Sequence, residues 1–144
     1  MFIFDLDHTV IDSSHRQITA VDGSLNLDAW RAACTKENIM RDSLLPLAAF
    51  WREMRLAGQT VIVCTARVMT RWDFHFLDVH GLKFDACLSR NGEQDNRKDH
   101  ILKVDHLRVI PSVHEFVMFD DNDGVREAVS RELGVTCIHP RDFA

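Results

Sequence analysis

Residues 1–10 have the sequence MFIFDLDHTV, in which a short apolar run leads directly into two carboxylates. The run Phe2 to Phe4 is typical of a buried strand in a parallel sheet. Asp5 and Asp7 follow it, and side chains at this spacing on extended backbone point the same way. Ligands of open α/β sheets bind at the carboxyl ends of the strands. The stretch predicts a strand ending in a reactive acidic pair, one carboxylate to attack and one to handle a proton, although an Asx turn also suits these residue types.

Length and composition restrict the class of protein. The chain has 144 residues, 46% of them hydrophobic, which is enough to bury a core, and we expect one domain over residues 1–144. The formal charge of −5 disfavours tight, nonspecific binding to long nucleic acid. It does not exclude a local basic patch.

The cysteine pattern and the apolar runs predict a cytoplasmic protein without a membrane partner. The sequence has no C-x-x-C pair, so neither a zinc ribbon nor a disulfide framework is indicated. No run approaches the roughly 18 apolar residues of a membrane span, and no charged leader opens the chain. We expect reduced thiols at Cys34, Cys64, Cys87 and Cys137.

Apolar runs alternate with amphipathic segments along the rest of the chain. β-Branched and aromatic runs predict strands, whereas apolar residues at helical spacing predict helices. Strands that alternate with helices favour right-handed βαβ units, and hence a three-layer, Rossmann-like α/β fold with a mainly parallel sheet. The five expected strands are residues 2–4, 60–64, 84–88, 116–119 and 135–138, and the expected helices are one beginning near residue 27, 43–57, one around 72–79, 99–109 and 122–133.

Residues 11–42 are predicted to form a flap and a minimal cap. The first part is polar and contains glycine, and Asn26 is a suitable N-cap for a short helix from Leu27. About 35 residues can hold a flap and one helix but not a separate lid domain, so we expect an open mouth that admits bulky substrates. The three tryptophans, Trp30, Trp51 and Trp72, lie on apolar faces of predicted helices, which favours core packing over base stacking. This assignment is weakest for Trp30.

Polar side chains recur at the carboxyl ends of several predicted strands, which converge on one crevice in a parallel sheet. Clustered carboxylates repel unless a cation joins them, and oxygen-only ligands suit Mg²⁺. A Lys and an Arg would counter the remaining phosphoryl charge. The converging groups are Asp5 and Asp7 after the first strand, Thr65 and Arg67 after the second, Asp120 and Asp121 after the fourth, and Lys103 on the intervening helix.

This set of motifs resembles the haloacid dehalogenase (HAD) superfamily of phosphatases. D-x-D-x-T at residues 5–9, a Thr after the second strand, a Lys, and an acidic pair after the fourth strand occur in that superfamily's order. The resemblance implies a Mg²⁺-dependent phosphomonoesterase that acts through an aspartyl-phosphate. It makes Asp5 the nucleophile, Asp7 the general acid and base, Thr65 a phosphoryl ligand and Lys103 a charge stabiliser, with Mg²⁺ held by Asp5, Asp120 and the Asp7 carbonyl, and Asp121 acting through water or orienting the site.

Some of these residues also suit purely structural positions. Asp121 precedes a helix and also suits an N-cap. Lys98 is a rival for the role of Lys103. His8, beside Asp7, either tunes proton transfer or packs. Surface arginines are common, so Arg16 and Arg97 also fit solvent-exposed positions.

A closer resemblance is to the phosphatase module of bacteriophage-type polynucleotide kinase/phosphatase, which removes 3′-phosphates from nucleic-acid ends. Arg16, Arg67 and the stretch NRKDHILK at residues 96–103 match that module. The resemblance implies phosphate binding by Arg16, Arg67 and Arg97, together with Thr65 and Ala66. His8 and Ala66 stand where the family has glycine.

The sequence therefore predicts a polynucleotide 3′-phosphatase that acts on DNA or RNA ends in end repair, with Mg²⁺ as cofactor. The alternatives are a nucleotide or small-metabolite phosphatase on the same fold, another phosphoryl transferase, a phosphate-binding pseudoenzyme, and a subunit of an end-repair assembly. Asp7 speaks against the pseudoenzyme, because a binding module needs no second carboxylate for proton transfer.

Overall fold

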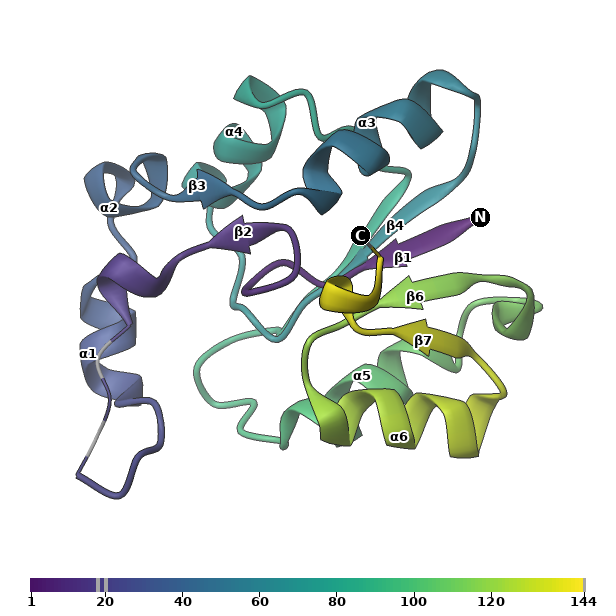
Figure 1. Ribbon diagram of the computed structural model, residues 1–144. Coiled ribbons are helices and arrows are strands. Elements are labelled where there is room, and N and C mark those ends of the chain that lie inside the picture. The colour runs from purple at the N-terminus through teal and green to yellow at the C-terminus, as the bar shows by residue number, and fades with distance from the viewer. Residues whose placement is uncertain (18, 20, 144) are drawn as a thin grey trace.

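The computed structural model describes residues 1–17, 19 and 21–143, and within them the main sheet has five strands. They are parallel, in the order β5-β4-β1-β6-β7. This arrangement confirms the predicted α/β class and the parallel sheet (Figure 1). The strands are β1 (Phe2–Phe4), β4 (Val61–Cys64), β5 (Ala86–Leu88), β6 (Val117–Phe119) and β7 (Thr136–Ile138).

Helices cover both faces of the sheet because successive strand residues point to opposite sides. Ile3 packs into one hydrophobic cluster with Met118, whereas Phe4 packs into the other, where its ring centroid lies 4.9 Å from that of Trp51. In Figure 1, α3 and α4 lie on one face and α5 and α6 on the other. The helices are α3 (Leu47–Leu56), α4 (Arg71–Val79), α5 (Asp99–Leu107) and α6 (Asp123–Leu133).

Local signals define the ends of the helix that follows the second acidic pair. Asn122 caps α6 through its side chain, which accepts from the Val125 amide. The same helix ends at Gly134, whose φ of 66° is a left-handed conformation that glycine adopts at little cost. Both ends of α6 agree with the sequence prediction. They fix where the chain leaves β6 and enters the helix.

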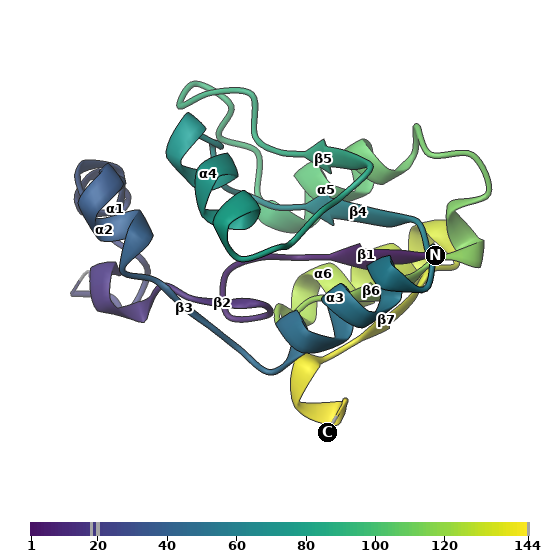
Figure 2. The ribbon, with the colours of Figure 1, turned by 90° about the horizontal axis from the view of Figure 1, so that it is seen from above.

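The described residues of the cap segment, 11–17, 19 and 21–42, lie beyond the carboxyl ends of the strands (Figure 2). This segment contains β2 (Ile11–Asp12), a 3₁₀ turn (Ser14–Arg16), α1 (Leu27–Ala32) and α2 (Lys36–Met40). Asn26 caps α1, as predicted. The second helix was not predicted, because its five residues are too few to show a helical apolar period.

The predicted helix 43–57 is wrong at its start. Ser43–Leu44 form β3, which pairs antiparallel with β2. Pro46 occupies the N-cap of α3, and a proline disfavours helical backbone at the residue before it. The chain therefore cannot extend α3 backward through this point, and a short two-stranded sheet takes its place.

Two short 3₁₀ helices complete the described elements, Val113–Glu115 and Pro140–Asp142. After the second of these, Phe143 packs against Phe50 and Phe119, with ring centroids 4.4 and 5.3 Å away. Across the described ranges, each helix is too short or too polar to cross a lipid bilayer.

Candidate active site

The sheet brings three polar residues to one edge. β1 pairs in parallel register with β4 on one side and β6 on the other. Asp5 follows β1 directly, Thr65 follows β4, and Asp120 follows β6. The Asp5 amide donates to the Phe119 carbonyl at 3.0 Å, which continues the ladder beyond the strand. The register of the sheet therefore places Asp5 between the other two.

Lys103 on α5 links the carboxylates that follow β1 and β6. Its Nζ donates to Asp5 Oδ1 at 2.8 Å and to Asp120 Oδ2 at 2.6 Å, and all three residues are buried. Burial opposes the charge of Lys103, but the two carboxylates outweigh it and raise the pKa of the ammonium well above its usual value. Lys103 is charged, whereas its rival Lys98 is exposed at the N-cap of α5.

Thr9 connects Asp5 with Asp121. Its hydroxyl lies 2.9 Å from Asp5 Oδ2 and 3.3 Å from Asp121 Oδ1, and it accepts from the Asp121 amide at 3.2 Å. Because Asn122 caps α6, the alternative role of Asp121 as an N-cap does not hold. Sequence reasoning gave Thr9 no role, although the residue belongs to the D-x-D-x-T motif.

Asp5, Asp120 and Asp121 form an acidic cluster that fits a divalent cation. One carboxylate oxygen from each lies within 4.8 Å of the others. Burial, followed by the charge of Asp5, raises the pKa of both Asp120 and Asp121. A cation relieves such repulsion, and Mg²⁺ prefers oxygen ligands. The Asp7 side chain is not part of the cluster, so its carbonyl stays the predicted ligand from that residue.

Asp7 directs its carboxylate to Arg67. The guanidinium donates from Nε to Asp7 Oδ2 at 2.8 Å and from Nη2 to Oδ1 at 2.7 Å, and the Ser13 hydroxyl donates to Oδ1 at 2.5 Å. Burial opposes ionisation, but the charge and hydrogen bonds of Arg67, with the Ser13 bond, outweigh it and lower the pKa of Asp7 to about 2. Asp7 is therefore ionised and held in one orientation.

The Arg67 guanidinium is shared among three carboxylates. Besides Asp7, it donates to Asp73 Oδ1 at 2.7 Å and lies 3.5 Å from Asp42 Oδ2. Only 4% of its side chain is exposed. The Thr70-x-x-Asp73 pattern is a capping signal that could have located Asp73, and the structure shows that capping box. No local pattern marks Asp42.

The acidic cluster lines a cavity of about 510 Å³ that extends to the cap segment. This volume is within the range of small-molecule sites. Asp7, Ala66 and Arg67 also line it, while Thr65 is fully buried with its hydroxyl accepting from the Arg67 amide at 3.1 Å. Lining residues without a predicted site role include Leu25, Leu27, Trp30, Arg31, Val68 and Arg90.

Two arginines predicted to bind phosphate are not among the described residues of the cavity wall. Arg16 is buried and donates to both oxygens of Asp42, at 2.9 and 2.8 Å. Arg97 pairs with Asp95 at 2.9 and 2.8 Å and with Asp105 at 3.1 Å. Arg16 and Arg97 match the phosphatase module in sequence position, but in the structure both guanidinium groups are paired with neighbouring carboxylates.

His8 and Ala66, the two departures from glycine, differ in backbone conformation. His8 has a φ of 62°, the left-handed region in which a side chain is strained, whereas Ala66 is not among the residues with positive φ. The His8 amide donates to the Ile11 carbonyl at 2.9 Å, and its Nε2 lies 2.8 Å from Gln17 Oε1. Only position 8 of the two therefore requires the conformation that glycine would adopt freely.

Comparison with known sequences places the chain in a family. The family model for the bacteriophage T5 5′-deoxynucleotidase matches residues 1–142. The chain belongs to this family. It is 31% identical over 155 aligned positions to the 5′-deoxynucleotidase of Escherichia phage T5, covering 90% of this chain. The match spans only 63% of that relative's length.

Solved structures show the same fold. A chain of the Pnkp1/Rnl/Hen1 RNA repair complex superposes with a TM-score of 0.73 at 23% identity, covering 96% of this chain and 41% of that one. A haloacid dehalogenase-like hydrolase from Streptococcus pneumoniae superposes with a TM-score of 0.64 at 14% identity, covering 94% and 81%. These likenesses show that the chain shares the fold of those proteins, as the motif order predicted.

Proposed function

We propose that this chain is a Mg²⁺-dependent phosphomonoesterase that hydrolyses a nucleoside 5′-monophosphate, with Asp5 as the nucleophile. The observation that carries the proposal is the contact of Asp5 with Lys103 beside the carboxylates of Asp120 and Asp121. The substrate class is supported by the phage relative, which is itself named a 5′-deoxynucleotidase.

The residues around Asp5 suit covalent phosphoryl transfer. An Asp5 oxygen bonds to phosphorus while the bond to the ester oxygen breaks, and Asp7 gives that oxygen a proton. Water then attacks the aspartyl-phosphate and passes a proton to Asp7, which frees inorganic phosphate and the Asp5 carboxylate. Because Arg67 holds Asp7 ionised in the free chain, Asp7 first takes up the proton of the phosphate monoanion and then gives it to the ester oxygen, which its low pKa favours; at the end of the cycle it returns the water's proton to the released phosphate.

The positive charges have separate roles in this scheme. Lys103 contacts Asp5 and Asp120 directly, so it holds the nucleophile in place and offsets phosphoryl charge. Asp5, Asp120 and Asp121, with the Asp7 carbonyl, would hold Mg²⁺, which would act as a Lewis acid on the phosphoryl oxygens. Thr65 is the proposed phosphoryl ligand. Arg67 is assigned to Asp7 rather than to the substrate, because its donors already meet carboxylates.

Removal of 3′-phosphates from nucleic-acid ends is the second candidate function. It is favoured by the motif stretch at residues 96–103 and by the likeness in fold to a chain of an RNA repair complex. The sequence supported this candidate through the predicted phosphate binding by Arg16, Arg67 and Arg97. All three are paired with carboxylates, which leaves less charge for a neighbouring backbone phosphate than the sequence predicted. We therefore place the 5′-mononucleotide first.

A substrate panel tests the proposal. Phosphate release is measured from 2′-deoxynucleoside 5′-monophosphates, nucleoside 3′-monophosphates, sugar phosphates and 3′-phosphorylated oligonucleotides, with Mg²⁺ or with excess chelator. We expect the highest kcat/KM on 5′-mononucleotides and no turnover in chelator. A higher value on 3′-phosphorylated oligonucleotides would replace the proposal with the second candidate. Full activity in chelator would refute the Mg²⁺ requirement.

A further inference from the structure

Helix α1 presents exposed apolar side chains to the cavity. None of its six described residues, Leu27–Ala32, is buried. Leu27 is 55% exposed and Leu25, just before the helix, is 39% exposed. Both line the cavity together with Trp30, and Val68, 37% exposed, lines it from the loop after β4. Apolar side chains therefore gather in the part of the cavity wall that we call its mouth, in contrast to the acidic cluster.

Trp30 is held in a fixed place at this mouth. The Arg16 guanidinium carbon lies 4.3 Å from the centroid of its ring. Arg16 is itself anchored by two hydrogen bonds to Asp42, and it donates to Cys34 Sγ at 3.2 Å. The Cys34 thiol donates to the Trp30 carbonyl at 3.1 Å. The indole thus rests on a buried charged network that is rigid at its base.

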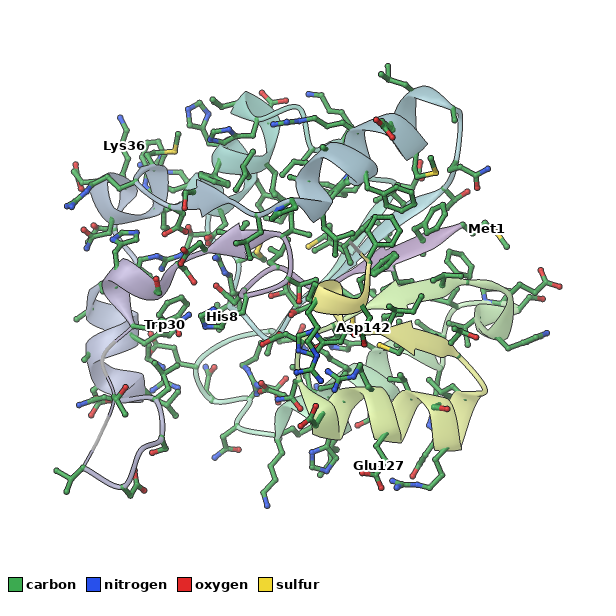
Figure 3. All side chains as sticks on the ribbon, in the orientation of Figure 1. Met1, His8, Trp30, Lys36, Glu127 and Asp142 are labelled. Carbon is green, nitrogen blue, oxygen red and sulfur yellow. The ribbon has the colours of Figure 1, made fainter. Side chains whose placement is uncertain are left out.

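A second contact holds α1 against the opposite side of the cavity. Arg31 Nη2 donates to the Glu93 carbonyl at 3.4 Å, and both residues line the cavity. In Figure 3, Trp30 lies on the side of α1 that faces His8. His8 borders the same cavity as the catalytic carboxylates. The aromatic ring and the phosphoryl site therefore belong to one continuous space.

We propose that Trp30 is a stacking platform for the base of the nucleotide substrate, with Leu25, Leu27 and Val68 against the edges of the base. The inference rests on the proposed nucleotidase function and names what the outer half of the cavity recognises. A phosphate at Asp5 fills only the acidic part of about 510 Å³. A flat apolar group attached to it would then meet the aromatic and aliphatic side chains of the mouth.

This placement also gives a role to Arg16. Because Arg16 is buried against Asp42 and the Trp30 ring, it acts as a positioning residue for the platform and does not touch the substrate. The sequence had favoured core packing for Trp30. That interpretation holds for Trp51, which is fully buried, but not for Trp30, which is half-buried at the cavity.

The test compares a nucleotide with the same sugar phosphate without a base. In an Asp5→Asn background with Mg²⁺, calorimetry gives the Kd of 2′-deoxyadenosine 5′-monophosphate and of 2-deoxyribose 5-phosphate for Trp30, Trp30→Leu and Trp30→Phe. Stacking on an aromatic side chain predicts that Trp30→Leu weakens nucleotide binding by about 5- to 150-fold and leaves the sugar phosphate unchanged. Trp30→Phe should restore much of the loss.

Trp72→Leu is the matched control. Trp72 on α4 is also half-buried beside cations, Lys36 and Arg71, but it is not among the described residues that line the cavity. Its replacement should leave both Kd values unchanged. Equal weakening of both ligands by Trp30→Leu would overturn the stacking inference while leaving the nucleotidase proposal intact. A wild-type chain that hydrolyses no nucleotide would instead overturn the proposed function.

Discussion

The acidic end of the sheet and the cap segment border the same cavity but differ in the polarity and burial of the side chains that they present to it. Asp5, Lys103 and Asp120 are at most 5% exposed and satisfy one another through short hydrogen bonds. Leu25 and Leu27 across the cavity are apolar and largely open to solvent. The first region has its partners within the protein, whereas the second exposes apolar side chains that the proposed base would cover. On this basis we assign the reaction to the acidic end and the choice of substrate to the cap segment.

Removing the nucleophile probes the acidic end with the largest expected effect. Asp5→Asn should lower phosphate release by on the order of 10⁴-fold or more, because an amide cannot form the phosphoryl bond. Circular dichroism should show the parent fold. Asp78→Asn, which changes an exposed carboxylate on α4, should retain full activity. A folded Asp5→Asn protein with normal turnover would end the covalent mechanism.

Lys103→Met tests whether the charge between the two carboxylates serves catalysis. Its loss should reduce kcat by about 10²- to 10³-fold, the usual effect of removing one preorganised charge-stabilising group. Lys98→Met at the start of the same helix is the matched control, because that side chain is exposed, and it should change kcat by less than about twofold. Equal losses in the two variants would mean that Lys103 has no special role.

The acidic end was predictable because each of its parts follows a local rule. A buried apolar strand followed by Asp5 has one orientation in a parallel sheet, and neighbouring strands deliver Thr65 and Asp120 to the same edge. Lys103 was identified from the motif order of the HAD superfamily, because it lies on the helix before the fourth predicted strand. The positions of these residues could be predicted without predicting the conformation of any loop.

The cap segment was less predictable because its placement depends on contacts between residues distant in sequence. Asp42 meets Arg16 across 26 positions, and no periodicity marks that pair. Asp42 also lies beside Arg67, which pairs with Asp7, and Arg16 contacts the Trp30 ring outside the core. Spacing therefore located the arginines in the chain but not the carboxylates that engage them.

Arg67→Met separates a positioning role from substrate binding. The variant leaves Asp7, Asp42 and Asp73 without their shared cation, which should lower the free energy of unfolding by about 3–5 kcal/mol in urea titrations. Arg55→Met, which breaks the exposed pair with Asp85, should cost much less. A stable Arg67→Met protein that fails only on oligonucleotides would instead restore the phosphate-binding role predicted from the sequence.

Arg97→Ala has the smallest expected effect and bears on the 3′-end alternative. The Arg97 side chain is 37% exposed and pairs with Asp95 and Asp105 outside the described cavity wall. Exposed ion pairs contribute little, so the melting temperature should match that of the parent and the KM for a 5′-mononucleotide should change by less than about twofold. The informative measurement is KM for a 3′-phosphorylated oligonucleotide at low and moderate salt. If Arg97 neutralised a backbone phosphate there, its removal would raise that KM and flatten its salt dependence by about one unit of slope. We expect neither change, because the guanidinium is already occupied by two carboxylates.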